Sequence, residues 1–342
     1  MAADTTPRQS RWPLLGRFPA LAGLSPVTLC DLPTPVSHFS QQLWIKHDDA
    51  TRTDQGGNKA RKLEFVLSDI RRRNARRVIT FGATGTNAGV ATSLLCQREK
   101  LHCEIITFPQ PDSAVVRHNQ AVMRHSGACL VSRSSLWQAA LSWYLHPRRL
   151  DPKSYFLYAG CSASIATFAY INAMFELQQQ IQSGALPKPG HIVVAAGSGA
   201  TVAGVLAGAA LVLPETRIHA IQVAPSRVGP FLACHPDVVR EMAKNAWQQL
   251  CQCDDQLPAM PTDALYWHDQ WLGEGYGART SAADAAIQTA EKKQLLLETT
   301  YSAKAFAAAL AISSENSAPT LFWQTFSHAR LDHPGVPEGT SE

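Results

Sequence analysis

The chain has 342 residues, 45% of them hydrophobic and 17% charged, a balance typical of a globular protein with a sizeable core and room for about two domains. The net charge of +4 is too mild to favour a nucleic-acid partner, and no apolar run is long enough to span a bilayer. The first residues lack the apolar segment of a signal peptide and the eight cysteines are scattered, so we expect a cytoplasmic protein with reduced thiols.

From about Lys59 onward, the pattern alternates helices with short apolar strands. The preceding segment is irregular and rich in proline, and it ends in a predicted strand over residues 43–50. The helices are predicted at 62–73, 86–100, 115–127, 164–182, 200–214, 281–294 and 302–312, and the strands at 76–83, 102–108, 128–132, 155–160, 191–197, 217–223, 295–300 and 320–326. Residues 238–269 are predicted to be mostly helical, and Ser281 is expected to pair with Asp284 as a helix N-cap.

Short continuous apolar strands between helices indicate parallel sheets that are covered on both faces. Two such series meet near residues 145–155. The sequence therefore predicts an α/β protein with two units and twisted, mostly parallel sheets.

The segment GGNKARKLEF, which begins at Gly56, places Lys59 behind two glycines and at the start of a helix. One interpretation is a solvated lysine in a capping turn, with Asn58 as the cap. The other is functional. A helix N-terminus disfavours a positive charge, so it lowers the pKa of the amine and prepares it to form a Schiff base.

The segment AAGSGATVAG, residues 195–204, follows a strand and opens a helix. Its backbone N–H groups and two hydroxyls can converge on one anion. The loop residues are Gly197, Ser198, Gly199, Ala200 and Thr201. Four residues separate Gly199 from Gly204, whereas two separate the last glycines of the dinucleotide-binding motif. The acidic residue that this motif requires further along the chain is also absent. The loop therefore suits a single phosphate, and the alternative is a turn that small residues occupy for packing.

Two further turns carry polar side chains. GATGTNAG, residues 82–89, places Thr86 and Asn87 at a helix cap, either for capping alone or to bind a carboxylate. TTYSAK, residues 299–304, places Tyr301 and Ser302 where a strand is predicted to end, which is weak as a site signal by itself. Cys251 and Cys253 lack a second ligand pair at metal-binding spacing, so we expect no metal.

The motifs, taken in the order in which they occur along the chain, resemble those of the fold-type II enzymes that depend on pyridoxal 5′-phosphate (PLP). More narrowly, the chain is similar to the family of D-cysteine desulfhydrase and 1-aminocyclopropane-1-carboxylate (ACC) deaminase. The matching segments are PTPV, IKHDD, GGNKARKLEF, TNAG, YAGCSAS, GSGATVAG, GYGART and LLLETTYSAK, and they span nearly the whole chain.

The resemblance implies a fold like that of the tryptophan synthase β subunit. A large PLP-binding domain would comprise residues 1–60 and 169–342, and a small α/β domain residues 61–168. The cofactor would lie in the cleft between them, and a homodimer is the usual assembly of the family.

The resemblance also implies roles for single residues. Lys59 would bind PLP and later move the Cα proton of the substrate, and Asn87 would hydrogen-bond the phenolic oxygen of PLP. Thr86 would take the substrate carboxylate, Tyr276 and Tyr301 would face the substrate, and Ser302 would face the pyridine nitrogen. The complete cofactor-binding set is Lys59, Asn58, Asn87, Gly197, Ser198, Gly199, Ala200, Thr201 and Ser302.

The chain departs from the family around the carboxylate site. Val90 stands where an arginine is common, Thr86 replaces a serine, and Ala303 replaces a glycine. The leading hypothesis is a PLP-dependent lyase that removes a β-substituent from a small, cysteine-like amino acid to give pyruvate and ammonia. The alternatives are an ACC deaminase, then a β-replacing synthase or a racemase, and, from another class, a non-catalytic protein that binds PLP or an amino acid.

Overall fold

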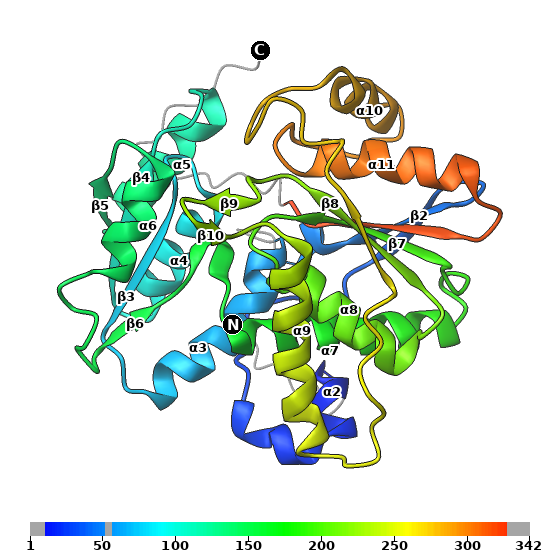
Figure 1. The fold of residues 1–342 in the computed structure, drawn as a ribbon, viewed down its shortest axis with the longest axis horizontal. Helices are drawn as coiled ribbons and strands as arrows, with labels where there is room; N and C mark the ends of the chain where they lie inside the picture. Colours follow the sequence, from blue (N-terminus) through cyan, green and yellow to red (C-terminus); the bar gives the residue numbers. More distant parts are fainter. Residues whose placement is uncertain (1–10, 52–56, 327–342) are drawn as a thin grey trace.

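The computed structural model describes residues 11–51 and 57–326, so Gly56 of the lysine motif lies outside the described residues. Within these ranges the chain forms two mostly parallel sheets with helices on both faces (Figure 1). The α/β class predicted from the sequence is confirmed.

The larger sheet has six strands in the order β1-β2-β12-β7-β8-β11, and only β1 runs antiparallel to its neighbour. Its strands come from both ends of the described chain. They are β1 (Val36–Ser40), β2 (Leu43–His47), β7 (His191–Ala196), β8 (Arg217–Gln222), β11 (Leu265–His268) and β12 (Thr320–Gln324). A separate hairpin joins β9 (Arg227–Val228) to β10 (Phe231–Leu232).

The smaller sheet has four parallel strands in the order β5-β4-β3-β6. Its strands are β3 (Arg77–Ala83), β4 (His102–Phe108), β5 (Cys129–Ser132) and β6 (Ser154–Phe156). All four therefore come from one continuous stretch of the chain, which lies on the left of Figure 1.

Helices cover each sheet on both sides (Figure 1). On the larger sheet, α7 (Ser164–Gln182), α8 (Ala200–Val212) and α9 (Pro236–Cys251) pack on one face, and α10 (Ser281–Glu291) and α11 (Ser302–Glu315) on the other. On the smaller sheet, α3 (Asn58–Arg72), α4 (Asn87–Arg98) and α5 (Ala114–His125) lie opposite α6 (Leu136–Tyr144). The short elements are α2 (Pro13–Arg17), η1 (Pro19–Leu24), η2 (Asp48–Ala50) and η3 (Ala159–Cys161).

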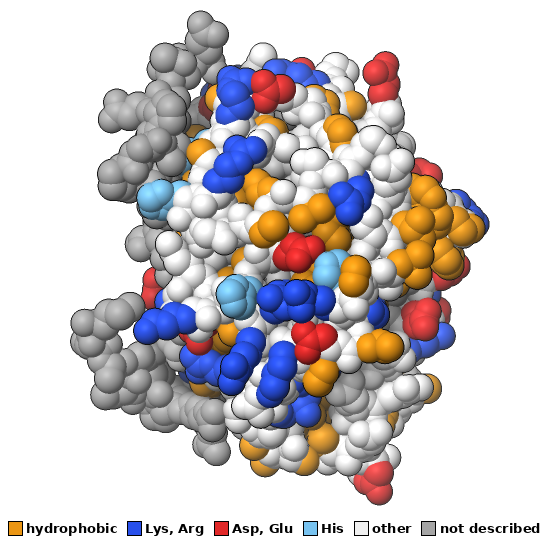
Figure 2. Space-filling model, turned by 90° about the vertical axis from the view of Figure 1, so that its left-hand side faces the viewer, with side chains coloured by type: hydrophobic (Ala, Val, Ile, Leu, Met, Phe, Trp, Pro, Cys, Tyr) orange, Lys and Arg blue, Asp and Glu red, His pale blue; other side chains and the backbone are white. Residues whose placement is uncertain are grey.

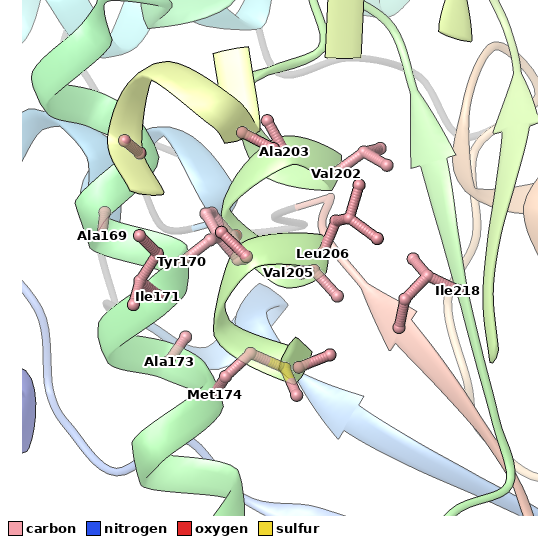
Figure 3. Packing of buried hydrophobic residues seen from close by; sticks show 14 of the residues in the cluster. Ala169, Tyr170, Ile171, Ala173, Met174, Val202, Ala203, Val205, Leu206 and Ile218 are labelled. Carbon is pink, nitrogen blue, oxygen red and sulfur yellow. The ribbon is translucent and has the colours of Figure 1, made fainter. Parts of the chain in front are cut away.

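The close packing of α8 against α7 explains two glycines. A Cβ on Gly204 would collide with the Thr167 carbonyl, and a Cβ on Gly208 would lie 2.7 Å from Met174 Cβ. On its other side, α8 directs Val202 and Leu206 toward Ile218 of β8 (Figure 3). The helix that follows the 197–201 loop is therefore fixed on two sides, and Gly204 serves packing.

A buried ionic network fixes the start of α3. The Arg61 guanidinium donates to Asp48 at 2.9 Å and to both carboxylate oxygens of Glu176 at 2.9 Å. Lys46 also donates to Glu176, and the Trp323 indole donates to Asp48 at 2.8 Å. Because Arg61 is two residues from Lys59, the network holds the lysine motif against the larger sheet.

The structure corrects several local predictions. Residues 295–300 are not a strand, because the Glu298 carboxylate accepts the N–H groups of residues 300–302 and closes a turn before α11. The cap of α10 is Thr280, not Ser281, since the Thr280 hydroxyl accepts from Ala283 N. The sequence prediction also missed β1, α6 and β11, the last within a region expected to be helical.

Candidate active site

Lys59 is the second residue of α3, and the helix begins after Gly57, whose φ of +77° is a conformation that favours glycine. Its Nζ donates to Asn58 Oδ1 at 2.5 Å. Burial lowers the pKa of the Lys59 amine, and the charges of Cys161 and Glu298 offset only part of this effect. The amine is therefore closer to its neutral, nucleophilic form than an exposed lysine would be.

Asn58 does not cap α3 with its side chain, contrary to one of the two interpretations of the motif. Instead its Nδ2 donates to Thr201 Oγ1 at 3.2 Å. The lysine at the start of α3 and the loop at the start of α8, 143 residues apart in sequence, thus meet through one amide.

The 197–201 loop has the geometry of an anion site. Gly199 has a φ of +89° and directly precedes α8. The N–H groups of residues 198–201 donate to no acceptor among the described residues. The loop is held from behind, where Ser162 Oγ donates to Ser198 Oγ at 2.7 Å. Unpaired N–H groups at the N-terminus of a well-packed helix are suited to bind a phosphate.

Tyr301 lies beside this loop and contacts a second tyrosine, Tyr276. The Tyr276 and Tyr301 hydroxyls are hydrogen-bonded to each other, and their rings meet edge to face with centroids 5.9 Å apart. A Cβ on Gly197 would lie 3.8 Å from the Tyr301 ring. Burial raises the pKa of Tyr276 to about 12 and that of Tyr301 well above its ordinary value, so both phenols are protonated at neutral pH.

Thr86 and Asn87 lie where α4 begins. Thr86 is the N-cap, and its hydroxyl accepts from Gly89 N at 3.3 Å, as predicted for a capping residue. The first turns of α4 contact η3, since Cys161 Sγ lies 3.7 Å from Ala88 O and 3.5 Å from Thr92 Oγ1. Burial raises the pKa of the Cys161 thiol, and η3, which contains it, contacts both α3 and α4.

Ser302 lies at the start of α11, where its side chain is 1% exposed. Its Oγ accepts from Glu298 N at 2.8 Å and donates to Glu298 O at 3.2 Å. These bonds give the hydroxyl a local role, and its proposed contact with a pyridine nitrogen stays a prediction.

The sequence prediction missed two buried groups beside Lys59. Glu298 accepts three backbone N–H groups at 2.7 Å each, and burial raises its pKa despite these bonds. Lys62 donates to Gly160 O at 2.5 Å, and burial together with the charge of Lys59 lowers its pKa to about 7. The i to i+3 spacing of Lys59 and Lys62 on one helix was the available signal for the second amine.

Comparisons with known proteins identify similar enzymes. D-cysteine desulfhydrase of Klebsiella pneumoniae is 28% identical over 302 residues, which are 86% of this chain and 88% of the relative. The enzyme of the same name from Salmonella typhimurium is 26% identical over 303 residues, with the same two coverages.

Solved structures show a similar fold. A homologue of ACC deaminase superposes with a TM-score of 0.73 at 24% identity, covering 90% of this chain and 94% of its own. A hydrogen sulfide-producing enzyme from Fusobacterium nucleatum superposes with a TM-score of 0.58 at 11% identity, covering 91% and 99%. The sequence profile described as "Pyridoxal-phosphate dependent enzyme" matches residues 22–322. The chain therefore belongs to the family of pyridoxal-phosphate dependent enzymes.

Proposed function

We propose that this enzyme is a lyase that catalyses β-elimination from a small, cysteine-like amino acid. For cysteine, the amino acid and one water give pyruvate, ammonia and hydrogen sulfide, which balances all atoms. The similar D-cysteine desulfhydrases, matched over most of their length, support the substrate class. The observation that carries the proposal is Lys59, a half-buried lysine whose amine has a lowered pKa and is linked through the Asn58 amide to the 197–201 loop.

The residues present fit PLP. The unpaired N–H groups of residues 198–201 suit its phosphate, and the Lys59 amine suits its aldehyde. Asn87, at the start of α4, is proposed to donate to the phenolic oxygen, and Ser302 to face the pyridine nitrogen. When bound, PLP supplies the electron sink that stabilises negative charge at the substrate Cα.

The protein's own residues are proposed to move the proton, bind the substrate carboxylate and assist the leaving group. The Lys59 amine is proposed to take the Cα proton, because burial lowers its pKa and so makes its lone pair more available than that of an exposed lysine. The N-terminus of α4, which Thr86 caps, is proposed to bind the substrate carboxylate together with the Thr86 hydroxyl. Both phenols keep their proton at neutral pH, so while one of Tyr276 and Tyr301 donates to the other, the second is proposed to donate to a leaving thiolate.

Ser302 favours elimination over ring opening of ACC. The resemblance places a glutamate at this position in ACC deaminases, where a negative charge keeps the pyridine nitrogen protonated. A serine hydroxyl carries no charge, and the single proton of Ser302 is donated to Glu298 O, so it does not keep the nitrogen protonated and the electron sink is weaker. A weaker sink suffices when the β-carbon carries a good leaving group such as a thiolate.

A substrate screen of the PLP-loaded protein tests the proposal. D- and L-cysteine, D- and L-serine, β-chloroalanine and ACC are incubated with enzyme, and pyruvate, 2-oxobutyrate and ammonia are measured, with Lys59→Ala as the control. We expect pyruvate from a cysteine-like substrate and none from the variant. Faster turnover of ACC than of every β-substituted amino acid would favour the deaminase. A change of the absorption spectrum with no keto acid from any compound would favour a binding protein.

We further propose a cytoplasmic homodimer in which residues 61–168 form the smaller domain. All eight cysteines are free thiols, which supports the proposal that the protein resides in a reducing compartment. None of the described helices has the length and apolar character needed to cross a membrane. The face in Figure 2 carries a group of basic side chains, with acidic, histidine and apolar side chains beside them. Light scattering after size-exclusion chromatography tests the dimer.

A further inference from the structure

A buried asparagine outside the predicted site contacts one of its members. Asn119 lies on α5 and is 5% exposed. Its Nδ2 donates to Gly85 O at 2.8 Å and to Asn87 Oδ1 at 2.9 Å. These two bonds use both hydrogens of the amide.

The backbone carbonyl determines how both amides are oriented. Gly85 O can only accept, so the Asn119 atom that faces it is the NH2 group. The same NH2 group faces Asn87, so the Asn87 atom at 2.9 Å is its oxygen. The NH2 group of Asn87 is then the end left over, and it donates to no acceptor in the described part of the chain. The contact with Asn119 therefore orients the side chain of Asn87 so that its NH2 group can donate a hydrogen bond to a ligand. Asn87 itself is half-buried.

We propose that Asn119 is a positioning residue that fixes the polarity of the Asn87 amide, so that Asn87 presents its NH2 group to the phenolic oxygen of bound PLP. This inference rests on the proposed function, in which Asn87 makes that contact. An ionised phenolic oxygen is an acceptor, and a donor beside it favours its ionised form. With the amide reversed, Asn87 would present its carbonyl oxygen and repel the phenolate.

Asn119 also has a structural role, because its bond to Gly85 ties α5 to the turn before α4. The two roles predict different results. A purely structural residue changes protein stability and site geometry independently of Asn87. A positioning residue acts through Asn87, so its effect disappears when the Asn87 amide is absent.

The test compares Asn119→Asp, Asn87→Ala and the double variant with the parent. A carboxyl group cannot donate to both Gly85 O and Asn87, so Asn119→Asp forces the Asn87 amide to reverse or to lose its partner. Gln120→Glu is the matched control, since it also replaces an amide with a carboxylate, at the next residue of the chain. The Gln120 side chain accepts from Arg124 at 3.2 Å. Asn119→Ser replaces the aspartate variant if that variant fails to fold.

Three quantities are measured: PLP affinity, the pH midpoint of the visible absorbance of the PLP-loaded protein, and the thermal midpoint of the cofactor-free protein. We expect Asn119→Asp to weaken PLP binding about tenfold and to raise the pH midpoint, because hydrogen bonds to charged groups contribute roughly this much. The double variant should match Asn87→Ala, and Gln120→Glu should match the parent.

The outcomes separate the two proposals. If Asn87→Ala shifts the pH midpoint but Asn119→Asp does not, the positioning role is wrong and the cofactor contact stands. Additive shifts in the double variant also overturn the positioning role. If Asn87→Ala itself leaves both PLP affinity and the pH midpoint unchanged, the proposed cofactor contact fails, and the inference fails with it.

Discussion

The Nζ atom of Lys59 lies 2.5 Å from Oδ1 of Asn58, the residue that precedes it. The other end of the same amide donates to Thr201 in the loop that begins α8. One side chain therefore sets the distance between the amine that is proposed to hold the PLP aldehyde and the loop that is proposed to hold its phosphate. The first two predictions concern this arrangement.

Borohydride reduction of the PLP-loaded protein is expected to fix the cofactor on Lys59. The competing amine is Lys62, which is closely adjacent and has a pKa of about 7. Lys62 donates to Gly160 O and is 1% exposed, so it is poorly placed to reach a cofactor. Peptide mapping identifies the labelled residue, and Lys59→Ala should remove the label. A label on Lys62, or one that persists in Lys59→Ala, contradicts the assignment.

Asn58→Asp is expected to slow PLP uptake at neutral pH. A carboxylate beside Lys59 favours the charged amine and raises its pKa, and each unit of increase leaves about tenfold less neutral amine. Uptake should therefore recover as the pH rises. Stopped-flow absorbance between pH 6 and 10 measures this dependence. Asn58→Ala is the control, because it loses the contact with Thr201 without adding a charge. Equal pH profiles for the two variants would show that charge is not the cause.

Much of the candidate site was predictable because its parts have local signals. Thr86 and the 197–201 loop each stand between a strand and a helix, where small and polar residues mark a turn. Lys59 was found in the same way, from glycines before an apolar helical pattern. Each signal lies within about ten residues of chain, which is the range that sequence periodicity covers.

What was missed depends on contacts between distant residues. Asn119 bonds to Asn87, 32 positions earlier, and Arg61 bonds to Glu176, 115 positions later. Neither partner changes the local pattern of its helix, so only the tertiary structure reveals the pairs. The turn at Glu298 was read as a strand because LLL carries the apolar signal of one, and the capping carboxylate overrides it.

Glu176→Gln is expected to destabilise the fold and to change its acid sensitivity. Burial alone would raise the pKa of Glu176, but Arg61 and Lys46 outweigh it and lower the pKa to about 2. Because this lies below the value of a free glutamate, about 4.3, the carboxylate stabilises the fold above that pH and loses this contribution as the pH falls toward 2. Removing one partner of a buried ion pair typically costs about 3–5 kcal/mol.

Urea unfolding of both proteins between pH 3 and 7 measures the effect on the free energy of unfolding. The difference between parent and Glu176→Gln should be largest near neutral pH and should shrink on the acid side. Glu215→Gln is the matched control, since that carboxylate is exposed and pairs with Lys188 at the surface. A difference that does not vary with pH would mean that Glu176 acts through packing rather than through its charge.

Ala200→Asp is expected to abolish PLP binding while leaving the cofactor-free protein folded. Ala200 is the first residue of α8, directly after Gly199 in the loop proposed to bind phosphate. A carboxylate at a helix N-terminus interacts favourably with the helix dipole, which offsets part of the cost of placing Asp at a position that is 1% exposed. The same carboxylate would stand against the phosphate in a partly dry site, and an unpaired buried charge costs about 3–5 kcal/mol, or more than a hundredfold in affinity.

Ala200→Ser is the control, because it adds a small polar group without a charge, and it should bind PLP within a few-fold of the parent. Fluorescence titration with PLP gives the affinities, and thermal unfolding of the cofactor-free variants gives their stability. If Ala200→Asp bound PLP as tightly as Ala200→Ser, the phosphate would have to lie elsewhere.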